Sequence, residues 1–142
     1  MRRILVTGAN KGIGLAIVTR LLRDFDDTFL FLGSRDLGRG QAAVEQIKTE
    51  VGAGVVGRVE VLRLDVTSDA SVSEAVDAVA KHGTEPLYGL VNNAGGVPGT
   101  ARETLDLNTI GLRRVCEAFL PLIQKEGGEC TYPLNRFPLQ ES

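Results

Sequence analysis

The 142-residue chain has the length of one domain, and its 43% hydrophobic and 24% charged residues are typical of a soluble globular protein. A formal net charge of −2 at pH 7 argues against nucleic acid or an anionic membrane as the main partner. No apolar run approaches the roughly 20 residues that span a bilayer. We therefore expect neither a nucleic-acid partner nor a membrane partner.

The start of the chain and its cysteines indicate a compartment. Residues 1–6 lead directly into a strand-like run, without the longer apolar region and cleavage site of a secretory signal. The two cysteines, Cys116 and Cys130, lack the spacing of metal ligands. We expect reduced thiols in a cytoplasmic protein.

Two kinds of apolar pattern alternate along the chain. Buried-strand patterns occupy residues 4–6, 28–32, 59–64 and 87–91. Helical spacing occupies residues 13–22, 42–51, 68–80 and 105–123. Ile13 is expected on the buried side of the first helix, and Ser68 is expected to cap the third. Four strand–helix units predict an α/β fold, a Rossmann-like parallel sheet with helices on both faces.

A glycine-rich segment joins the first predicted strand to the first helix. It reads Thr7-Gly8-Ala9-Asn10-Lys11-Gly12-Ile13-Gly14. In such a loop Gly8 permits the sharp turn, Gly12 lets the backbone approach a pyrophosphate, and Gly14 permits close packing of helix on strand. The N–H groups at the helix start favour the anion. An alternative interpretation is a tight turn without a ligand, whereas a P-loop would need Gly-Lys-Ser/Thr at its end.

The end of the second predicted strand indicates which dinucleotide binds. A carboxylate there typically holds the ribose of NAD, and an arginine typically holds the 2′-phosphate of NADP. Arg35 follows Ser34 at this point, and Lys11 adds a second positive charge. These residues favour NADPH over NADH. Asp36 argues the other way, because it can pair with Arg35 or bind the ribose itself.

Four segments occur in a characteristic order: the glycine loop, Leu64-Asp65-Val66, Asn92-Asn93-Ala94-Gly95, and Asn108 with Gly111. Together they resemble the short-chain dehydrogenases/reductases. Three further details, residues 8–18, Ser34-Arg35-Asp36 and residues 40–44, resemble the NADPH-dependent carbonyl reductases in particular. The resemblance covers residues 3–123, so that residues 1–126 are expected to form an incomplete NAD(P)-binding domain. It implies oxidoreductase chemistry, in which a hydride passes from NADPH to a small-molecule carbonyl substrate.

The resemblance also implies residue roles. Asp65 and Val66 would lie beside the adenine, and Asn108 would hold a water of the proton relay. The predicted cofactor-binding residues are Gly8, Asn10, Lys11, Gly12, Ile13, Gly14, Arg35, Asp65, Val66, Asn93, Ala94 and Gly95. Plainer interpretations remain open: Asp65 as a helix cap, Asn92 and Asn93 as partners of backbone groups at the sheet edge, and Asn108 as an exposed helix residue.

The acid/base residues of that family do not appear in this sequence. The family uses a tyrosine, a lysine four residues later that lowers the tyrosine pKa, and a serine. After Asn108 the sequence has one tyrosine, Tyr132, followed four places later by Arg136. Its only lysine and serine there are Lys125 and Ser142. We therefore expect this chain alone to be inactive, and either a non-catalytic NADPH-binding module or a fragment.

The tail, residues 127–142, has neither apolar period and is predicted to be irregular. Strand 87–91 would then be an exposed sheet edge. Helix 105–123 would expose Leu112, Val115 or Phe119, a surface through which the chain could form an oligomer. Three hypotheses would explain a tail of this kind: a truncated gene model, an alternative transcript or a frameshifted end.

Overall fold

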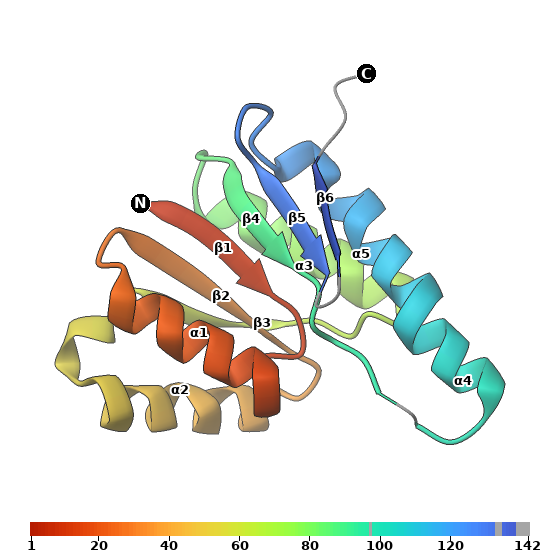
Figure 1. Ribbon diagram of the computed structural model, residues 1–142, viewed down its shortest axis with the longest axis horizontal. Helices are drawn as coiled ribbons and strands as arrows, with labels where there is room; N and C mark the ends of the chain where they lie inside the picture. Colours follow the sequence, from red (N-terminus) through yellow and green to blue (C-terminus); the bar gives the residue numbers. More distant parts are fainter. Residues whose placement is uncertain (97, 133–134, 139–142) are drawn as a thin grey trace.

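The computed structural model describes residues 1–96, 98–132 and 135–138. These residues form a six-stranded sheet in the order β3-β2-β1-β4-β5-β6 (Figure 1). The strands are β1 (Arg2–Val6), β2 (Thr28–Ser34), β3 (Val59–Arg63), β4 (Leu87–Val91), β5 (Glu129–Tyr132) and β6 (Asn135–Pro138). The first five are parallel and β6 is antiparallel to β5, so the predicted Rossmann-like parallel sheet is confirmed.

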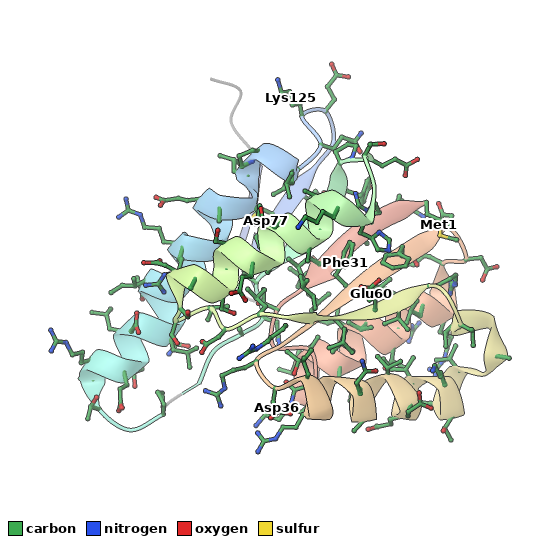
Figure 2. The ribbon with its side chains drawn as sticks, turned by 180° about the vertical axis from the view of Figure 1, so that it is seen from behind. Met1, Phe31, Asp36, Glu60, Asp77 and Lys125 are labelled. Atoms are coloured by element: carbon green, nitrogen blue, oxygen red, sulfur yellow. The ribbon has the colours of Figure 1, made fainter. Side chains whose placement is uncertain are left out.

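Helices cover both faces of the sheet (Figures 1 and 2). The main ones are α1 (Gly12–Asp24), α2 (Leu37–Val51), α3 (Asp69–His82) and α5 (Gly111–Phe119). Successive residues of one strand point to opposite faces, so Leu30 joins the core with α1 and α2, whereas Phe31 joins the core with α3 and α5. Both faces are buried, which explains the continuous apolar run of β2. Within the described part of the chain, no helix is long and apolar enough to cross a membrane.

Side chains fix the starts of two helices. The Asp36 carboxylate accepts a hydrogen bond of 2.8 Å from the Arg39 backbone N–H at the start of α2, where Figure 2 labels it. The Ser68 hydroxyl accepts one of 3.2 Å from the Ser71 N–H at the start of α3, which confirms the predicted cap.

The segment predicted as one helix, residues 105–123, is divided in the structure. It comprises α4 (Ala101–Leu105), the π-helical turn η2 (Asp106–Ile110), α5 and the 3-10 turn η3 (Leu120–Leu122). The start lies earlier than predicted because Thr100 and Glu103 form a capping box. Val115 and Phe119 are fully buried against α3 and the sheet, so the prediction of an exposed apolar helix face is wrong for both.

The prediction that β4 would be an exposed edge is also wrong. Leu90 lies opposite Cys130 of β5, and β5 pairs with β6, so two further strands cover that edge. The predicted irregular tail therefore contains two four-residue strands. Neither is long or apolar enough to reveal itself as a sequence pattern, because pairing with β4 creates the sheet environment that each one needs.

Ile13 was predicted on the buried side of the first helix, but its side chain is 71% exposed, so that prediction is wrong. Ile13 lies in the first turn of α1 and lines the cleft beside the glycine loop instead of the core. Val18 and Leu22, further along α1, are buried as predicted.

Candidate functional site

The loop between β1 and α1 has the backbone shape that its glycines predict. Gly8 and Gly12 have φ values of +60° and +57°, a region that residues with a Cβ rarely adopt. At Gly14 a Cβ would lie 2.6 Å from the Gly8 carbonyl oxygen, so the helix packs too closely here for any side chain. At Gly12 no atom of the described residues lies within 4 Å of that position. The loop is therefore closed at Gly14 and open at Gly12.

The start of α1 exposes its backbone donors. Lys11 precedes the helix, and no described side chain caps its first turn. The first N–H groups of a helix lack partners within the helix and carry its positive dipole end. An anion beside Gly12 would meet these N–H groups directly.

Thr7 and Asn93 join the ends of β1 and β4. The Thr7 hydroxyl accepts hydrogen bonds from the backbone N–H groups of Asn93 (3.0 Å) and Ala94 (2.9 Å). The Asn93 amide donates to the carbonyl oxygens of Thr7 (3.1 Å) and Gly8 (3.0 Å). The interpretation of Asn93 as a partner of backbone groups is thus confirmed. The sequence did not predict that Thr7 joins the two strands, although its hydroxyl stands immediately before the first glycine of the loop.

A cleft of about 670 Å³ opens beside this loop, at the carboxyl ends of the parallel strands. Strand order reverses between β1 and β4, and open α/β sheets bind ligands at such a switch point. All the residues predicted to bind a cofactor line the cleft except Gly14, whose position is internal. The cleft is lined by Gly8, Asn10, Lys11, Gly12, Ile13, Arg35, Asp36, Arg39, Leu64, Asp65, Val66, Thr67, Asn93, Ala94, Gly95, Pro98, Glu103, Asp106 and Leu107.

The cations in the cleft are available to a ligand, whereas its carboxylates have partners. Among the described residues no ion pair involves the three basic side chains, Lys11, Arg35 and Arg39. Asp36 caps α2 instead of pairing with Arg35. Arg39 was missed by the sequence argument, although its place four residues after Arg35, in the first turn of a helix, could have found it.

The other carboxylates in the cleft are also engaged. Asp65 accepts hydrogen bonds from the backbone N–H (3.0 Å) and the hydroxyl (2.6 Å) of Thr67. The interpretation of Asp65 as the helix cap is therefore wrong, because Ser68 has that place. Glu103 accepts from the Thr100 N–H and hydroxyl at 2.9 Å each, and these bonds hold the pKa of Glu103 below its usual range. Asp106 lies 3.8 Å from Arg114.

Asn108 holds the chain that leaves β4. Its side-chain oxygen accepts from the Gly96 N–H at 2.9 Å, and its amide donates to the Gly96 carbonyl oxygen at 2.6 Å. The side chain is exposed, as the plainer interpretation had it, and lies in the π-helical turn. Its predicted part in a proton relay stays a prediction.

The tyrosine and arginine considered for catalysis lie on strands. Tyr132 ends β5, Arg136 belongs to β6, and the antiparallel register pairs Thr131 with Arg136. A helix that presents both side chains on one face is therefore absent at these positions. Ser142 lies outside the described residues. No group of three or more metal-ligating side chains was found in the part of the chain that the structure covers.

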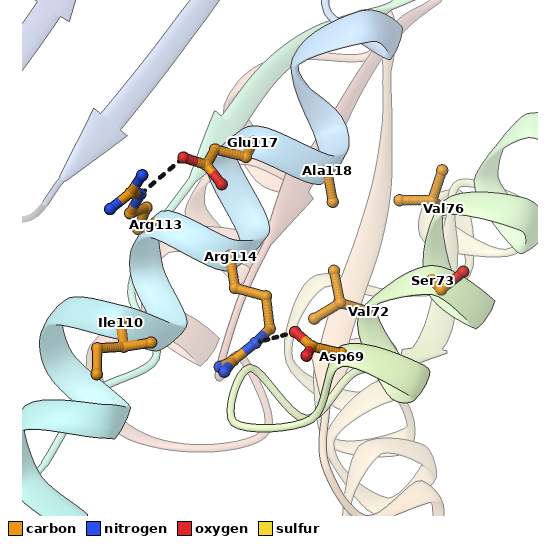
Figure 3. Close-up of a pocket in the computed structure, with 9 residues that line it drawn as sticks. All are labelled: Asp69, Val72, Ser73, Val76, Ile110, Arg113, Arg114, Glu117 and Ala118. Atoms are coloured by element: carbon orange, nitrogen blue, oxygen red, sulfur yellow. Dashed lines mark hydrogen bonds and ion pairs between the residues drawn. The ribbon is translucent and has the colours of Figure 1, made fainter. Parts of the chain in front are cut away.

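A second cleft of about 670 Å³ lies between α3 and α5 (Figure 3). Its charged groups neutralise one another: Arg113 pairs with Glu117 at 2.7 Å, and Arg114 pairs with Asp69 at 2.5 Å. The side chains between them include Val72, Val76 and Ala118. This cleft is lined by helix side chains alone and lacks the glycine loop, so the first cleft is the candidate site.

Comparison with known proteins decides the family. The model of the short chain dehydrogenase family matches residues 2–130. The chain belongs to the short-chain dehydrogenase family. Carbonyl reductase [NADPH] 1 of Macaca fascicularis is 39% identical over 140 residues, which cover 89% of this chain and 47% of that protein. The human protein of the same name is 40% identical over 136 residues, 87% of this chain and 45% of that one.

Solved structures agree. The short-chain dehydrogenase chain superimposes on menthone neomenthol reductase from Mentha piperita with a TM-score of 0.83 at 29% identity, covering 92% of this chain and 59% of that one. For the NADPH-bound carbonyl reductase from chicken fatty liver the TM-score is 0.71 at 30% identity, with 86% and 48% covered. The chain thus spans about half the length of the curated relatives that it matches.

Proposed function

We propose that this short-chain dehydrogenase chain binds NADPH in the cleft beside the glycine loop. The observation that carries the proposal is the set of three basic side chains, Lys11, Arg35 and Arg39, which line the cleft without an ion-pair partner among the described residues. NADPH differs from NADH by a 2′-phosphate, and arginine forks suit such a group. Two relatives that are 39% and 40% identical carry NADPH in their names, which supports the same preference.

The rest of the cofactor fits the same cleft. The diphosphate would meet the N–H groups at the start of α1, where the glycine at position 12 leaves open space. The adenine would lie against Val66 and Asp65, and the nicotinamide would lie toward Asn93 and Gly95. Bound NADPH supplies a hydride donor, and the residues of this chain bind and orient it.

Carbonyl reduction is the family reaction proposed for the whole enzyme, with a small-molecule carbonyl as substrate. We propose that this chain does not catalyse it alone, because no tyrosine and lysine four residues apart follow Asn108. A phenol with a pKa near 10 cannot act as acid/base at neutral pH without a neighbouring cation. The alternative function is that of a non-catalytic, NADPH-binding or regulatory module.

Two measurements on the full chain test these statements. Calorimetric titration and thermal unfolding should detect NADPH binding that is tighter than NADH binding; at a hundredfold excess over Kd, NADPH adds about 2.7 kcal/mol of stability. Equal affinity for the two cofactors would contradict the phosphate role. Steady NADPH oxidation with a reactive dicarbonyl would contradict the statement that the chain is inactive.

A further inference from the structure

The two cysteines lie side by side in the fold. Cys116 is on α5 and Cys130 is on β5, fourteen residues apart in sequence, and their sulfur atoms are 3.5 Å apart. The two sulfur atoms are not bonded to each other in the structure. The sequence contains no other cysteine. Their proximity was not foreseen, because it depends on the pairing of β5 with β4.

One amide binds both sulfurs. The Asn92 side-chain N–H group donates to Cys116 Sγ at 3.4 Å and to Cys130 Sγ at 3.3 Å. Asn92 directly follows β4 and is 2% exposed, so it fixes the two thiols at the carboxyl end of the sheet. A hydrogen bond from an amide also stabilises negative charge on sulfur.

We propose that Cys116 and Cys130 form a peroxide-sensitive dithiol, which closes reversibly into an intramolecular disulfide. The sulfur atoms need to approach from 3.5 Å to about 2.05 Å. Cys116 lies on α5 and Cys130 lies on β5, so a small shift of either element relative to the other would bring the two sulfur atoms together.

The reaction has two steps. The Cys116 thiolate attacks one oxygen of hydrogen peroxide, the O–O bond breaks, and the leaving hydroxide takes up the proton that the Cys116 thiol has released, which gives a sulfenic acid and one water. Cys130 then attacks the Cys116 sulfur, its proton passes to the leaving hydroxyl, and water departs. Peroxide is reduced to two molecules of water, and the two thiols are oxidised to one disulfide.

Burial assigns the order of the steps. Cys116 is half-buried, whereas Cys130 is 6% exposed, so a small oxidant reaches Cys116 first. The hydrogen bond with Cys116, followed by burial, raises the pKa of Cys130. Cys130 therefore keeps its proton more firmly and is the less accessible of the two sulfurs, which makes it the second to react.

The test uses the reduced full chain, treated with limited hydrogen peroxide and then with an alkylating agent. We expect a monomer lighter by two hydrogen atoms, a Cys116–Cys130 crosslink in peptide mapping, and recovery of both thiols with dithiothreitol. Sulfinic acid on Cys116 in the wild-type chain, a disulfide between two chains, or unchanged thiols in the folded protein would each overturn the proposal. None of these readouts depends on cofactor binding.

Two variants sharpen the assignment. In Cys130→Ser the oxidised Cys116 lacks its partner, so we expect it to proceed to sulfinic acid. In Cys116→Ser the buried Cys130 should stay reduced under the same treatment. The reverse pattern, with Cys130 oxidised first, would contradict the order of steps. Serine keeps an acceptor for the Asn92 amide, and the wild-type result stands even where a variant does not fold.

Discussion

Arg114 of α5 donates a hydrogen bond of 2.6 Å to the backbone carbonyl oxygen of Val66, which lines the cleft. The same guanidinium pairs with Asp69 at 2.5 Å, and its side chain is only 19% exposed. A helix distant in sequence thus fixes the loop between β3 and α3. Arg114 binds the backbone of Val66, the residue predicted to lie beside the adenine. It therefore positions that part of the cleft without contacting a ligand.

Replacement of this arginine should weaken both the fold and cofactor binding. Arg114→Gln removes a charged hydrogen bond to a part-buried carbonyl oxygen, and we expect a loss of about 1–2 kcal/mol in the free energy of unfolding. NADPH affinity should fall severalfold because the loop at Val66 loosens. Arg113→Gln is the matched control, since Arg113 pairs with the exposed Glu117 within its own helix, and its replacement should change neither quantity. Denaturant unfolding and calorimetric titration measure the two effects; equal effects of the two variants would refute the positioning role.

The phosphate preference depends on two arginines. Arg35→Ala and Arg39→Ala should each weaken NADPH binding about tenfold or more, because a charged hydrogen bond contributes about 1.5–3 kcal/mol. NADH binding should change by less than about twofold. Arg20→Ala, on the exposed side of α1, provides a control of equal charge change. If NADPH and NADH affinities fall in parallel, the arginines do not bind the 2′-phosphate.

Substitutions at two glycines of the loop should destabilise the protein for different reasons. Gly14→Ala places a Cβ 2.6 Å from the Gly8 carbonyl oxygen, so we expect about 2–3 kcal/mol of destabilisation from overpacking. Gly12→Ala meets no described atom but must adopt a φ of +57°, at about 1–2 kcal/mol, and its methyl group would obstruct the diphosphate. Gly54→Ala is a control with open space and no positive φ. Chemical denaturation ranks the three variants, and tight NADPH binding by Gly12→Ala would contradict the loop's role.

Low pH should weaken the capping box that Thr100 and Glu103 form at the start of α4. The backbone N–H and hydroxyl of Thr100 lower the pKa of Glu103 from its usual value of 4.5. A lowered pKa means that the carboxylate stabilises the fold above pH 4.5, and this contribution is lost as the pH falls through the folded-state pKa. Glu103→Gln should therefore have a lower Tm than the wild type at pH 7, and the difference should disappear as the pH falls below the folded-state pKa of Glu103. A constant difference in Tm across that range would show that ionised Glu103 does not stabilise the cap.

The sequence pattern was sufficient for four strand–helix units and for the cleft's glycine loop. It failed where an element depends on its neighbours. Glu129–Tyr132 has mixed polarity and four residues, so only the edge of β4 makes it a strand. Ile13 has helical spacing but lines the cleft in the first turn of α1, and its exposure cannot be read from the periodicity. Arg39 could be assigned to the cleft only once the structure showed where the first turn of α2 lies.

Local sequence patterns were enough to predict the parallel sheet, the turn at Gly8 and the positive charge that follows β2, because each prediction uses residues close in the chain. Which charged groups and thiols have partners became clear only in the folded structure. Folding directs Asp36 to a helix start and leaves Arg35 without a carboxylate partner among the described residues. It also places Cys116 beside Cys130. The two cysteines belong to a helix and a strand, so the distance between them follows from the packing of helix on sheet rather than from local propensity.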